Sequence, residues 1–322
     1  GALYDAVKRV QARGWVDRLE TTVEAHILPT AQVREACTIP GLSVRAATLC
    51  RDKPIMKDFL REAGVRCART VGVEDTEAAL KFAAEIGYPL VVKPRASAGA
   101  DGTLFVHDEQ QLRSALAAAE VGHGGSAALE EMIQGHEGFY DTLVVNGTIV
   151  HDFVCHYYPN VLEAMRTRWI SPQIVLTNRM DAAGYKPLYA LGQQVVAALG
   201  LGTTATHMEW FSGDNGLYFS EIGARPPGVR TWDMYSAGNG IDLYREWARA
   251  IVHGTVEERP SRQNCVGLIA LRPSGDGRIT HYDGVDVIQG RMGAHVMDCH
   301  LPEPGTPTQP VEAGYMANAW VR

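Results

Sequence analysis

Apolar residues recur along the chain with two spacings, one typical of amphipathic helices and one typical of strands. The helical spacing predicts helices at about 53–64, 75–86, 187–199 and 242–253. Shorter apolar runs predict strands at 88–94, 103–107, 127–133, 139–145, 148–155, 204–211 and 217–222. Because helices and strands succeed one another within the same segments, the pattern predicts a chain of the α+β or α/β class.

Turn-forming residues join two pairs of these strands into hairpins. An Asn-Gly pair at 146–147 lies between apolar runs, which is a strong signal for a two-residue hairpin. The turn GDNG separates the runs 204–211 and 217–222 in the same way. Here the loop length decides which side chains face one another: a three-residue loop places Glu209 opposite Glu221, whereas a two-residue loop sends them to opposite faces.

The two ends of the chain differ in pattern from its middle. Residues 1–60 mix helical patterns with short apolar segments, including a strand expected at 15–19, and read as the last part of an N-terminal α/β domain. Since the chain opens on a helix and without Met, an upstream segment is expected to be missing. Residues 259–322 are β-like and rich in Pro and Gly, which predicts a small β-rich subdomain.

Composition narrows the class of protein. The chain has 322 residues, of which 46% are hydrophobic and 21% charged, as in soluble globular proteins. Its net charge of −7 and the lack of a basic run argue against nucleic acid or a membrane as the main partner. Without a long apolar run or a signal pattern, a soluble cytoplasmic protein is expected. The six cysteines form no CxxC pair, so they are expected to be reduced and buried rather than to bind zinc.

Candidate phosphate-binding groups lie on either side of the first helical unit. Lys53 and Lys93 supply positive charge, and the small-residue loop at 97–102 offers backbone N–H groups that can wrap phosphate oxygens. The loop lacks the GxxxxGK[ST] and GxGxxG patterns, and taken alone it is more often a plain turn.

Acidic residues supply further candidate chemistry. The segment LEEMIQGHE at 129–137 could use backbone groups on an adenine edge and a carboxylate on ribose, or be a solvated acidic loop. If Glu209 and Glu221 face each other, two carboxylates suit Mg²⁺ bridging phosphates; otherwise they line a solvated hairpin edge. Arg225 could stabilise a transferring phosphoryl group or hold a carboxylate, although a lone arginine more often makes a surface ion pair.

In their order and spacing over about 50–255, these motifs resemble the ATP-grasp superfamily. The resemblance implies two α+β subdomains that clasp ATP, a lid-bearing one at 61–130 and a metal-binding catalytic one at 131–258. It implies that Lys53 and Lys93 contact the phosphates and that the loop with Ser97, Gly99 and Gly102 closes over them. It further implies the following roles: Glu130 with the main chain of Glu131 and Ile133 on adenine, Glu137 on ribose, Glu209 and Glu221 on one or two Mg²⁺ ions or substituting Mn²⁺, and Arg225 with Lys93 at the reacting phosphate.

One position departs from the family pattern. Many members have Asn two residues after the second metal-binding glutamate, where this chain has Gly223. Glycine offers no side-chain oxygen, so a second Mg²⁺ would need water or another ligand. Gly223 and the short N-terminal region together leave open a catalytically silent nucleotide-binding or scaffolding protein.

The resemblance is strongest to the branch of L-amino-acid ligases and carnosine-synthase-like enzymes, with a biotin-carboxylase-like enzyme as the alternative. It implies that ATP phosphorylates a carboxylate, that an amine attacks the acyl phosphate, and that ADP and phosphate leave. The partners would be small carboxylic acids and amines, in a possible homodimer. His207 is expected to hydrogen-bond beside the metal strand. The candidate substrate-binding residues are Arg166, Arg168, Arg225, Gly228, Trp232 and Tyr235.

Overall fold

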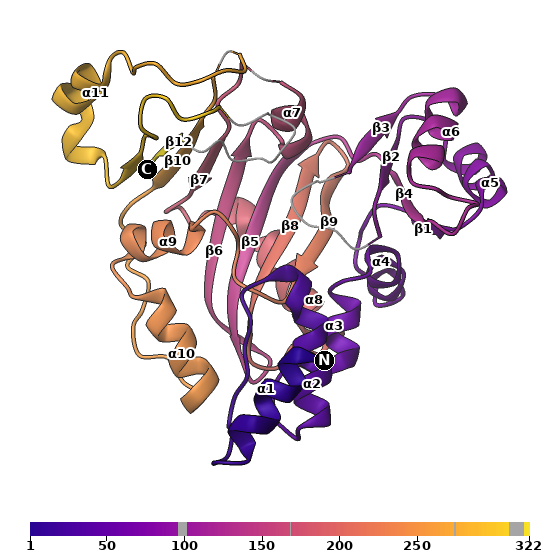
Figure 1. The fold of residues 1–322 in the computed structure, drawn as a ribbon, viewed down its shortest axis with the longest axis horizontal. Helices are drawn as coiled ribbons and strands as arrows, with labels where there is room; N and C mark the ends of the chain where they lie inside the picture. Colours follow the sequence, from indigo (N-terminus) through magenta and orange to yellow (C-terminus); the bar gives the residue numbers. More distant parts are fainter. Residues whose placement is uncertain (96–101, 168, 274, 309–318) are drawn as a thin grey trace.

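The computed structural model describes residues 1–95, 102–167, 169–273, 275–308 and 319–322. Two antiparallel sheets dominate it, a small one beside a large central one (Figure 1). The small sheet has the order β1-β4-β2-β3. Helices α5 (Thr76–Ile86) and α6 (Glu109–Ala118) pack against it around a shared apolar core. Its strands are β1 (Thr70–Val73), β2 (Leu90–Lys93), β3 (Leu104–Val106) and β4 (Ala127–Glu131).

The central sheet has eight strands in the order β11-β12-β10-β7-β6-β5-β8-β9. Two of its long strands, β5 and β6, form the hairpin that the Asn-Gly pair predicts. Residues at the C-terminal end of the chain join the same sheet, since β12 pairs with β10, which in turn pairs with β7. The strands are β5 (His136–Val145), β6 (Thr148–Tyr158), β7 (Gln173–Leu176), β8 (Thr204–Gly213), β9 (Gly216–Gly223), β10 (Val266–Leu271), β11 (Cys299–His300) and β12 (Ala319–Val321).

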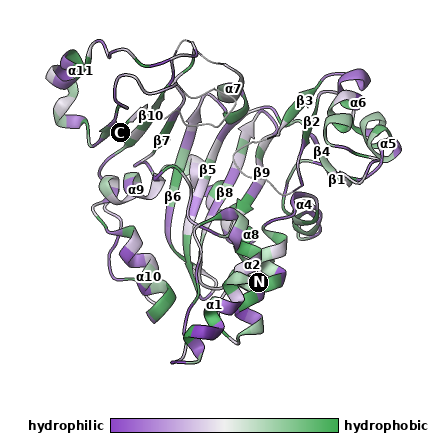
Figure 2. Ribbon diagram, viewed as in Figure 1, coloured by the Kyte–Doolittle hydropathy of each residue, from purple (hydrophilic) through white to green (hydrophobic). Residues whose placement is uncertain are grey.

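Alternate side chains of β5 point to the two faces of the central sheet, and each face carries its own core. Tyr140 and Val144 pack with α8 (Lys186–Leu199) on one face. Phe139 and Leu143 pack with α9 (Thr231–Asn239) and α10 (Leu243–His253) on the other. Surface helices such as α1 and α10 mix hydrophilic and hydrophobic residues along their length (Figure 2). Among the described residues, no helix is long and apolar enough to cross a bilayer.

The N-terminal region is helical, and it packs in one apolar core with α8 and one face of the central sheet (Figure 1). The strand expected at 15–19 does not form, and residues 1–69, all of them described, contain no strand. Asp52 caps the helix that begins at the predicted Lys53, accepting a hydrogen bond from the Ile55 N–H at 3.2 Å. The helices are α1 (Ala2–Gln11), η1 (Glu24–His26), α2 (Ile27–Ala36), α3 (Val44–Leu49) and α4 (Lys53–Glu62).

Four further helices are short. They are α7 (Val161–Arg166), η2 (Ala183–Tyr185), α11 (Val285–Met292) and η3 (Gly293–His295). All six cysteines have free thiols, but the expectation that they are buried holds for only part of them. Four of them are buried, whereas Cys265 and Cys299 are exposed.

Candidate active site

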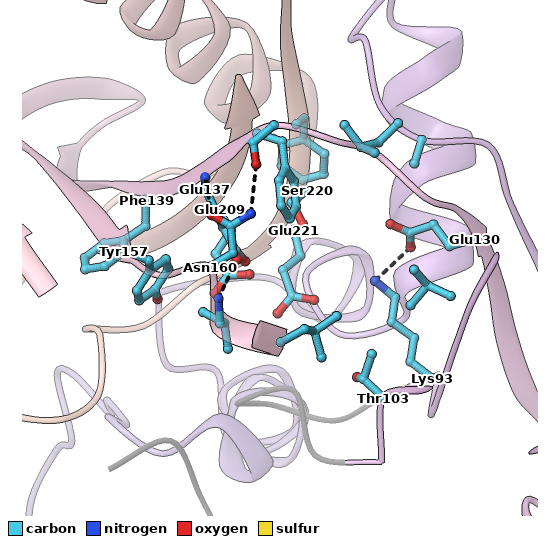
Figure 3. A pocket seen from close by; sticks show the side chains of 18 of the residues that line it. Lys93, Thr103, Glu130, Glu137, Phe139, Tyr157, Asn160, Glu209, Ser220 and Glu221 are labelled. Carbon is cyan, nitrogen blue, oxygen red and sulfur yellow. Dashed lines mark hydrogen bonds and ion pairs between the residues drawn. The ribbon is translucent and has the colours of Figure 1, made fainter. Parts of the chain in front are cut away.

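A cavity of about 530 Å³ is lined by residues of both sheets, of helix α4 and of the segments around α7 and before α9. In Figure 3, Lys93 and Glu130 of the small sheet lie at one end, and Phe139 and Tyr157 of the central sheet lie at the other. Most of the predicted site residues line this cavity: Lys53, Lys93, Glu130, Glu131, Ile133, Glu137, Glu209, Glu221, Arg225 and Gly228.

The β8–β9 hairpin brings two carboxylates together in the middle of the cavity. Gly213 pairs with Gly216, so the turn has two residues rather than three, and Trp210 pairs with Phe219. The register then shifts by one residue, and Glu209 pairs with Glu221. A β-bulge thus restores the facing carboxylates that a two-residue turn alone would separate.

Lysines of the neighbouring elements stabilise the negative charge of Glu221. Lys53 Nζ lies 3.4 Å from Glu221 Oε2. Burial alone would raise the pKa of Glu221, but Lys53 and then Lys93 lower it. Glu221 is therefore ionised near neutral pH and able to act as a metal ligand.

Glu130 lies between two lysines at the end of the cavity that the small sheet forms. Lys93 Nζ is 2.7 Å from Glu130 Oε2, and Lys57 Nζ contacts Oε1. Burial alone would raise the pKa of Glu130, but Lys57 and Lys93 lower it to about 2. Its side chain is thus engaged by ammonium groups, while Glu131 and Ile133 follow it along the cavity wall.

Glu137 is buried and lies beside the candidate metal pair. Its Oε2 accepts a hydrogen bond from the Val161 N–H at 2.7 Å, where helix α7 begins. Burial, followed by the charge of Glu209, raises the pKa of Glu137 to about 8. The carboxyl group is therefore largely protonated at neutral pH and can donate a hydrogen bond as well as accept one.

His207 is held by a chain of buried polar groups. Its Nδ1 lies 2.7 Å from Asp141 Oδ1, and the Tyr235 hydroxyl donates to Asp141 Oδ2 at 2.5 Å. On the other side of the ring, Nε2 is 3.7 Å from Glu209 Oε1. Burial alone would lower the pKa of His207, but Asp141 raises it to about 9. The imidazolium is a fixed cation beside the carboxylate pair, which agrees with the hydrogen-bonding role predicted for it.

Arg225 is anchored by a residue of the N-terminal region. Its Nε donates to Glu24 Oε2, and its Nη1 donates to the carbonyl of Pro226 at 2.8 Å. Arg51 Nη1 donates to the other oxygen of Glu24 at 2.6 Å. A Cβ on Gly223 would lie 3.0 Å from Glu24 Oε2, so glycine leaves room for this carboxylate. Glu24 is 201 residues from Arg225 in sequence, and no sequence motif pointed to it.

The end of the cavity farthest from Lys93 is apolar. Phe139, Tyr157 and Ile174 come from the adjacent strands β5, β6 and β7, and all line the cavity. The rings of Phe139 and Tyr157 lie 4.9 Å apart between centroids, at 48° to each other. These residues were not predicted to form part of the site. The signal that could have identified them is an apolar side chain on each of three adjacent strands.

Two residues expected to wall a substrate pocket lie elsewhere. Trp232 is buried in the core against Tyr244 and Trp247, and Tyr235 is fully buried beneath Asp141. Helix α9 turns both side chains towards the core of the central sheet, away from the cavity wall. Of the remaining predicted residues, Gly102 is described outside the cavity lining, Ser97, Gly99 and Arg168 lie outside the described residues, and Arg166 has no described side chain.

The electrostatic arrangement suits a magnesium polyphosphate. Two facing carboxylates are hard oxygen ligands, and lysines next to them suit phosphate oxygens. Within the part of the chain that the structure describes, no group of three or more His, Cys, Asp or Glu side chains could hold a metal ion. Oxygen atoms from a nucleotide and from water would therefore complete the coordination of an ion held by Glu209 and Glu221.

The sequence of this chain is similar to a known family model and to known enzymes. Residues 52–134 match the family model of the carbamoyl-phosphate synthase L chain, ATP binding domain. The chain is 28% identical over 235 residues to alanine–anticapsin ligase of Bacillus subtilis (strain 168), covering 64% of this chain and 48% of that protein. It is 23% identical over 240 residues to the carbamoyl phosphate synthase large chain of Clavibacter sepedonicus, covering 73% of this chain and 22% of that one. The chain therefore spans about half or less of the length of these relatives.

The fold is also found among solved structures. L-amino acid ligase from Bacillus licheniformis superposes with a TM-score of 0.78 at 20% identity, over 99% of this chain and 77% of that chain. The fold and the matched family model agree with the resemblance that the sequence predicts, which these comparisons confirm.

Proposed function

We propose that this chain, which has the ATP-grasp fold, is an ADP-forming carboxylate–amine ligase that makes an amide or peptide bond. The observation that carries the proposal is the pairing of Glu209 with Glu221 between the lysines and Arg225. A site of this kind would hold a magnesium polyphosphate and place a cation where negative charge develops. The ligases of the preceding comparisons support this choice of reaction.

The proposed role of each charged residue follows from its position in the cavity. Lys53 and Lys93 would neutralise the phosphates of ATP at one end of the cavity. Mg²⁺ on Glu209 and Glu221 would add positive charge next to the γ-phosphate. His207 Nε2 lies 3.7 Å from Glu209 Oε1, so its imidazolium would offset part of the negative charge of Glu209.

The proposed reaction has two steps. In the first, an oxygen of the substrate carboxylate forms a bond to the γ-phosphorus while the bond from that phosphorus to the bridging oxygen of ADP breaks. In the second, the amine nitrogen forms a bond to the acyl carbon, the bond to phosphate breaks, and the amine proton passes to solvent or phosphate. Arg225 would hold the carboxylate and the transferring group, since it lines the cavity and follows Glu221 by four residues in the chain.

The apolar end of the cavity supports amino acids with apolar side chains as substrates. Phe139, Tyr157 and Ile174 present carbon surface there, and burying an apolar side chain against them would favour binding. An enzyme of this kind would act on free small molecules, and we propose a cytoplasmic location and a possible homodimer.

The test is interception of the acyl phosphate. With ATP, Mg²⁺ and the right amino acid, hydroxylamine should give a hydroxamate, and oxygen-18 from the substrate carboxylate should appear in the released phosphate. Pairwise mixtures of the standard amino acids, assayed for ADP release, would identify the acid and the amine.

The same assay separates the alternatives. A biotin-carboxylase-like enzyme would release ADP with bicarbonate alone and carry label from bicarbonate into phosphate. A kinase would leave a stable phosphorylated product. A silent nucleotide-binding protein would bind ATP but would release no ADP with any of these substrates. Any of those three outcomes would replace the ligase proposal.

A further inference from the structure

A fully buried lysine lies behind the phosphate end of the cavity, and the proposed reaction gives it no role. Lys57 is 0% exposed, and its Nζ contacts Glu130 Oε1. The other oxygen of Glu130 is taken by Lys93 at 2.7 Å. One carboxylate is therefore shared by a lysine that lines the cavity and a lysine that does not.

The local fold explains how the three side chains meet. Lys53 and Lys57 are one turn apart on α4, so they project from the same side of the helix. Glu130 pairs directly with Val91 across the small sheet, so Lys93, two residues along β2, lies on the same face as Glu130. Lys53 is directed to Glu221, and Lys57 is directed to Glu130.

Each of these ammonium groups has a carboxylate beside it. Lys53 Nζ lies 3.4 Å from Glu221 Oε2, and Lys57 and Lys93 both contact Glu130. Burial lowers the pKa of Lys57 to about 8, with Glu130 opposing this shift, so the ammonium is still largely charged at pH 7. Glu130 is 7% exposed and ionised.

A lysine that binds phosphate must loosen its contact with any carboxylate it already holds. If Lys93 turns from Glu130 to a phosphate oxygen, Glu130 stays buried and charged, and a buried charge without a partner is costly. Lys57 cannot follow the nucleotide, because it lies behind Glu130 and is closed off from the cavity.

We infer that Lys57 is a positioning residue for nucleotide binding: it is the permanent partner of Glu130 and thereby allows Lys93 to exchange Glu130 for a phosphate oxygen. The inference rests on the nucleotide site of the proposed function and is independent of which reaction follows. Without Lys57, Lys93 would be the remaining ion-pair partner of Glu130 among the described residues, and ATP would have to compete with that carboxylate.

The experiment is a double-mutant cycle read out as ATP affinity by titration calorimetry with Mg²⁺. Lys57→Met should weaken ATP binding by about tenfold or more while residue 130 is Glu. In the Glu130→Gln background, where Lys93 has no carboxylate to leave, Lys57→Met should change the affinity by less than about threefold. Lys57→Gln is the second single variant in case the methionine variant does not fold, and the same weakening is expected.

Arg34→Met provides a matched control. Arg34 is a buried cation whose Nη2 lies 2.7 Å from Glu20 Oε2, in a pair outside the cavity lining. Its loss should lower stability and leave ATP affinity unchanged.

The outcomes separate this inference from the proposed function. If a folded Lys57 variant binds ATP like the wild type, the inference is wrong while the nucleotide site stands. Equal weakening in both backgrounds would show a long-range charge effect and would also overturn it. If the wild type binds no ATP at all, both proposals fail.

Discussion

Glu209 and Glu221 face each other across the β8–β9 hairpin because a β-bulge follows its two-residue turn. The extra residue of the bulge is Ser220, which lies between the Trp210–Phe219 and Glu209–Glu221 pairs. Bulges of this kind re-aim side chains near functional sites. Lys53, which lies outside the hairpin, places a positive charge beside Glu221 and so reduces the repulsion between the two carboxylates.

The first prediction concerns the metal. Glu221→Gln keeps size and hydrogen bonding but removes one charge, so turnover should fall by about a hundredfold or more and the Mg²⁺ requirement should rise. Stability should not increase, since Lys53 and Lys93 already stabilise the ionised form. Steady-state assays over a Mg²⁺ series would measure both effects.

Asp214→Asn is the control for this variant, because Asp214 is exposed in the turn of the same hairpin. Its turnover and Mg²⁺ dependence should match those of the wild type. Unchanged turnover in Glu221→Gln would remove Glu221 from the metal site.

The second prediction concerns the phosphates. Lys93→Ala should weaken ATP binding by about tenfold or more, because a charge-assisted contact to phosphate is lost. The protein should still fold, since Glu130 keeps its contact with Lys57. Calorimetry would compare this variant with Lys81→Ala, an exposed lysine on α5 that should bind ATP normally.

A third prediction follows from the buried carboxyl of Glu137. Its pKa of about 8 in the folded protein exceeds the ordinary value of 4.5, so its contribution to stability is present below about pH 4.5 and is lost as the pH rises through 8. Glu137→Gln stays neutral and keeps an acceptor for the Val161 N–H. The variant should match the wild type near pH 4.5 and exceed its stability by up to a few kcal/mol at pH 9.

Thermal unfolding of both proteins at several pH values would measure this difference. Glu163→Gln, a change at an exposed carboxylate on α7, is the control variant in the same measurements. A stability gap in Glu137→Gln that does not widen between pH 5 and 9 would contradict the raised pKa of Glu137.

Periodicity predicted the elements that carry the site, but the exact register had to come from the structure. The strand with Lys93 and the helix beginning at Lys53 follow from local patterns, which act over a few residues. The turn of the β8–β9 hairpin is the two-residue type that predicts separated acids, and only the bulge at Ser220 reverses that result. A bulge in a run such as Phe-Ser-Glu carries no sequence signal, because it depends on the partner strand.

Long-range contacts account for the rest of what the sequence missed. Trp232 suggested a pocket wall because it is large and apolar near the site, but packing against Trp247 draws it into the core. Lys57 could have been found, since it lies four residues after Lys53 on one helix face. Glu24 could not, because its partner Arg225 is 201 residues away.

The last prediction tests that contact. Glu24→Gln removes the charged partner that holds the Arg225 guanidinium, and Arg51 loses the same partner. We expect kcat to fall by about tenfold or more with ATP affinity nearly unchanged, because Arg225 is proposed to act on the transferring group rather than on nucleotide binding. Arg225→Lys should lose most activity as well, since a single ammonium cannot replace a planar guanidinium held at two points.

Glu20→Gln is the matched control for Glu24→Gln, since Glu20 pairs with Arg34 in the same N-terminal region. It should lower stability without a fall in kcat. Gly223→Asn offers an independent approach, because its side chain would meet Glu24 Oε2, which lies 3.0 Å from the position of a Cβ there. The added side chain should displace Glu24 and reduce kcat in the same way. If instead Gly223→Asn raises activity by supplying a metal ligand, Glu24 is dispensable and the orientation of Arg225 must come from Pro226 and the substrate.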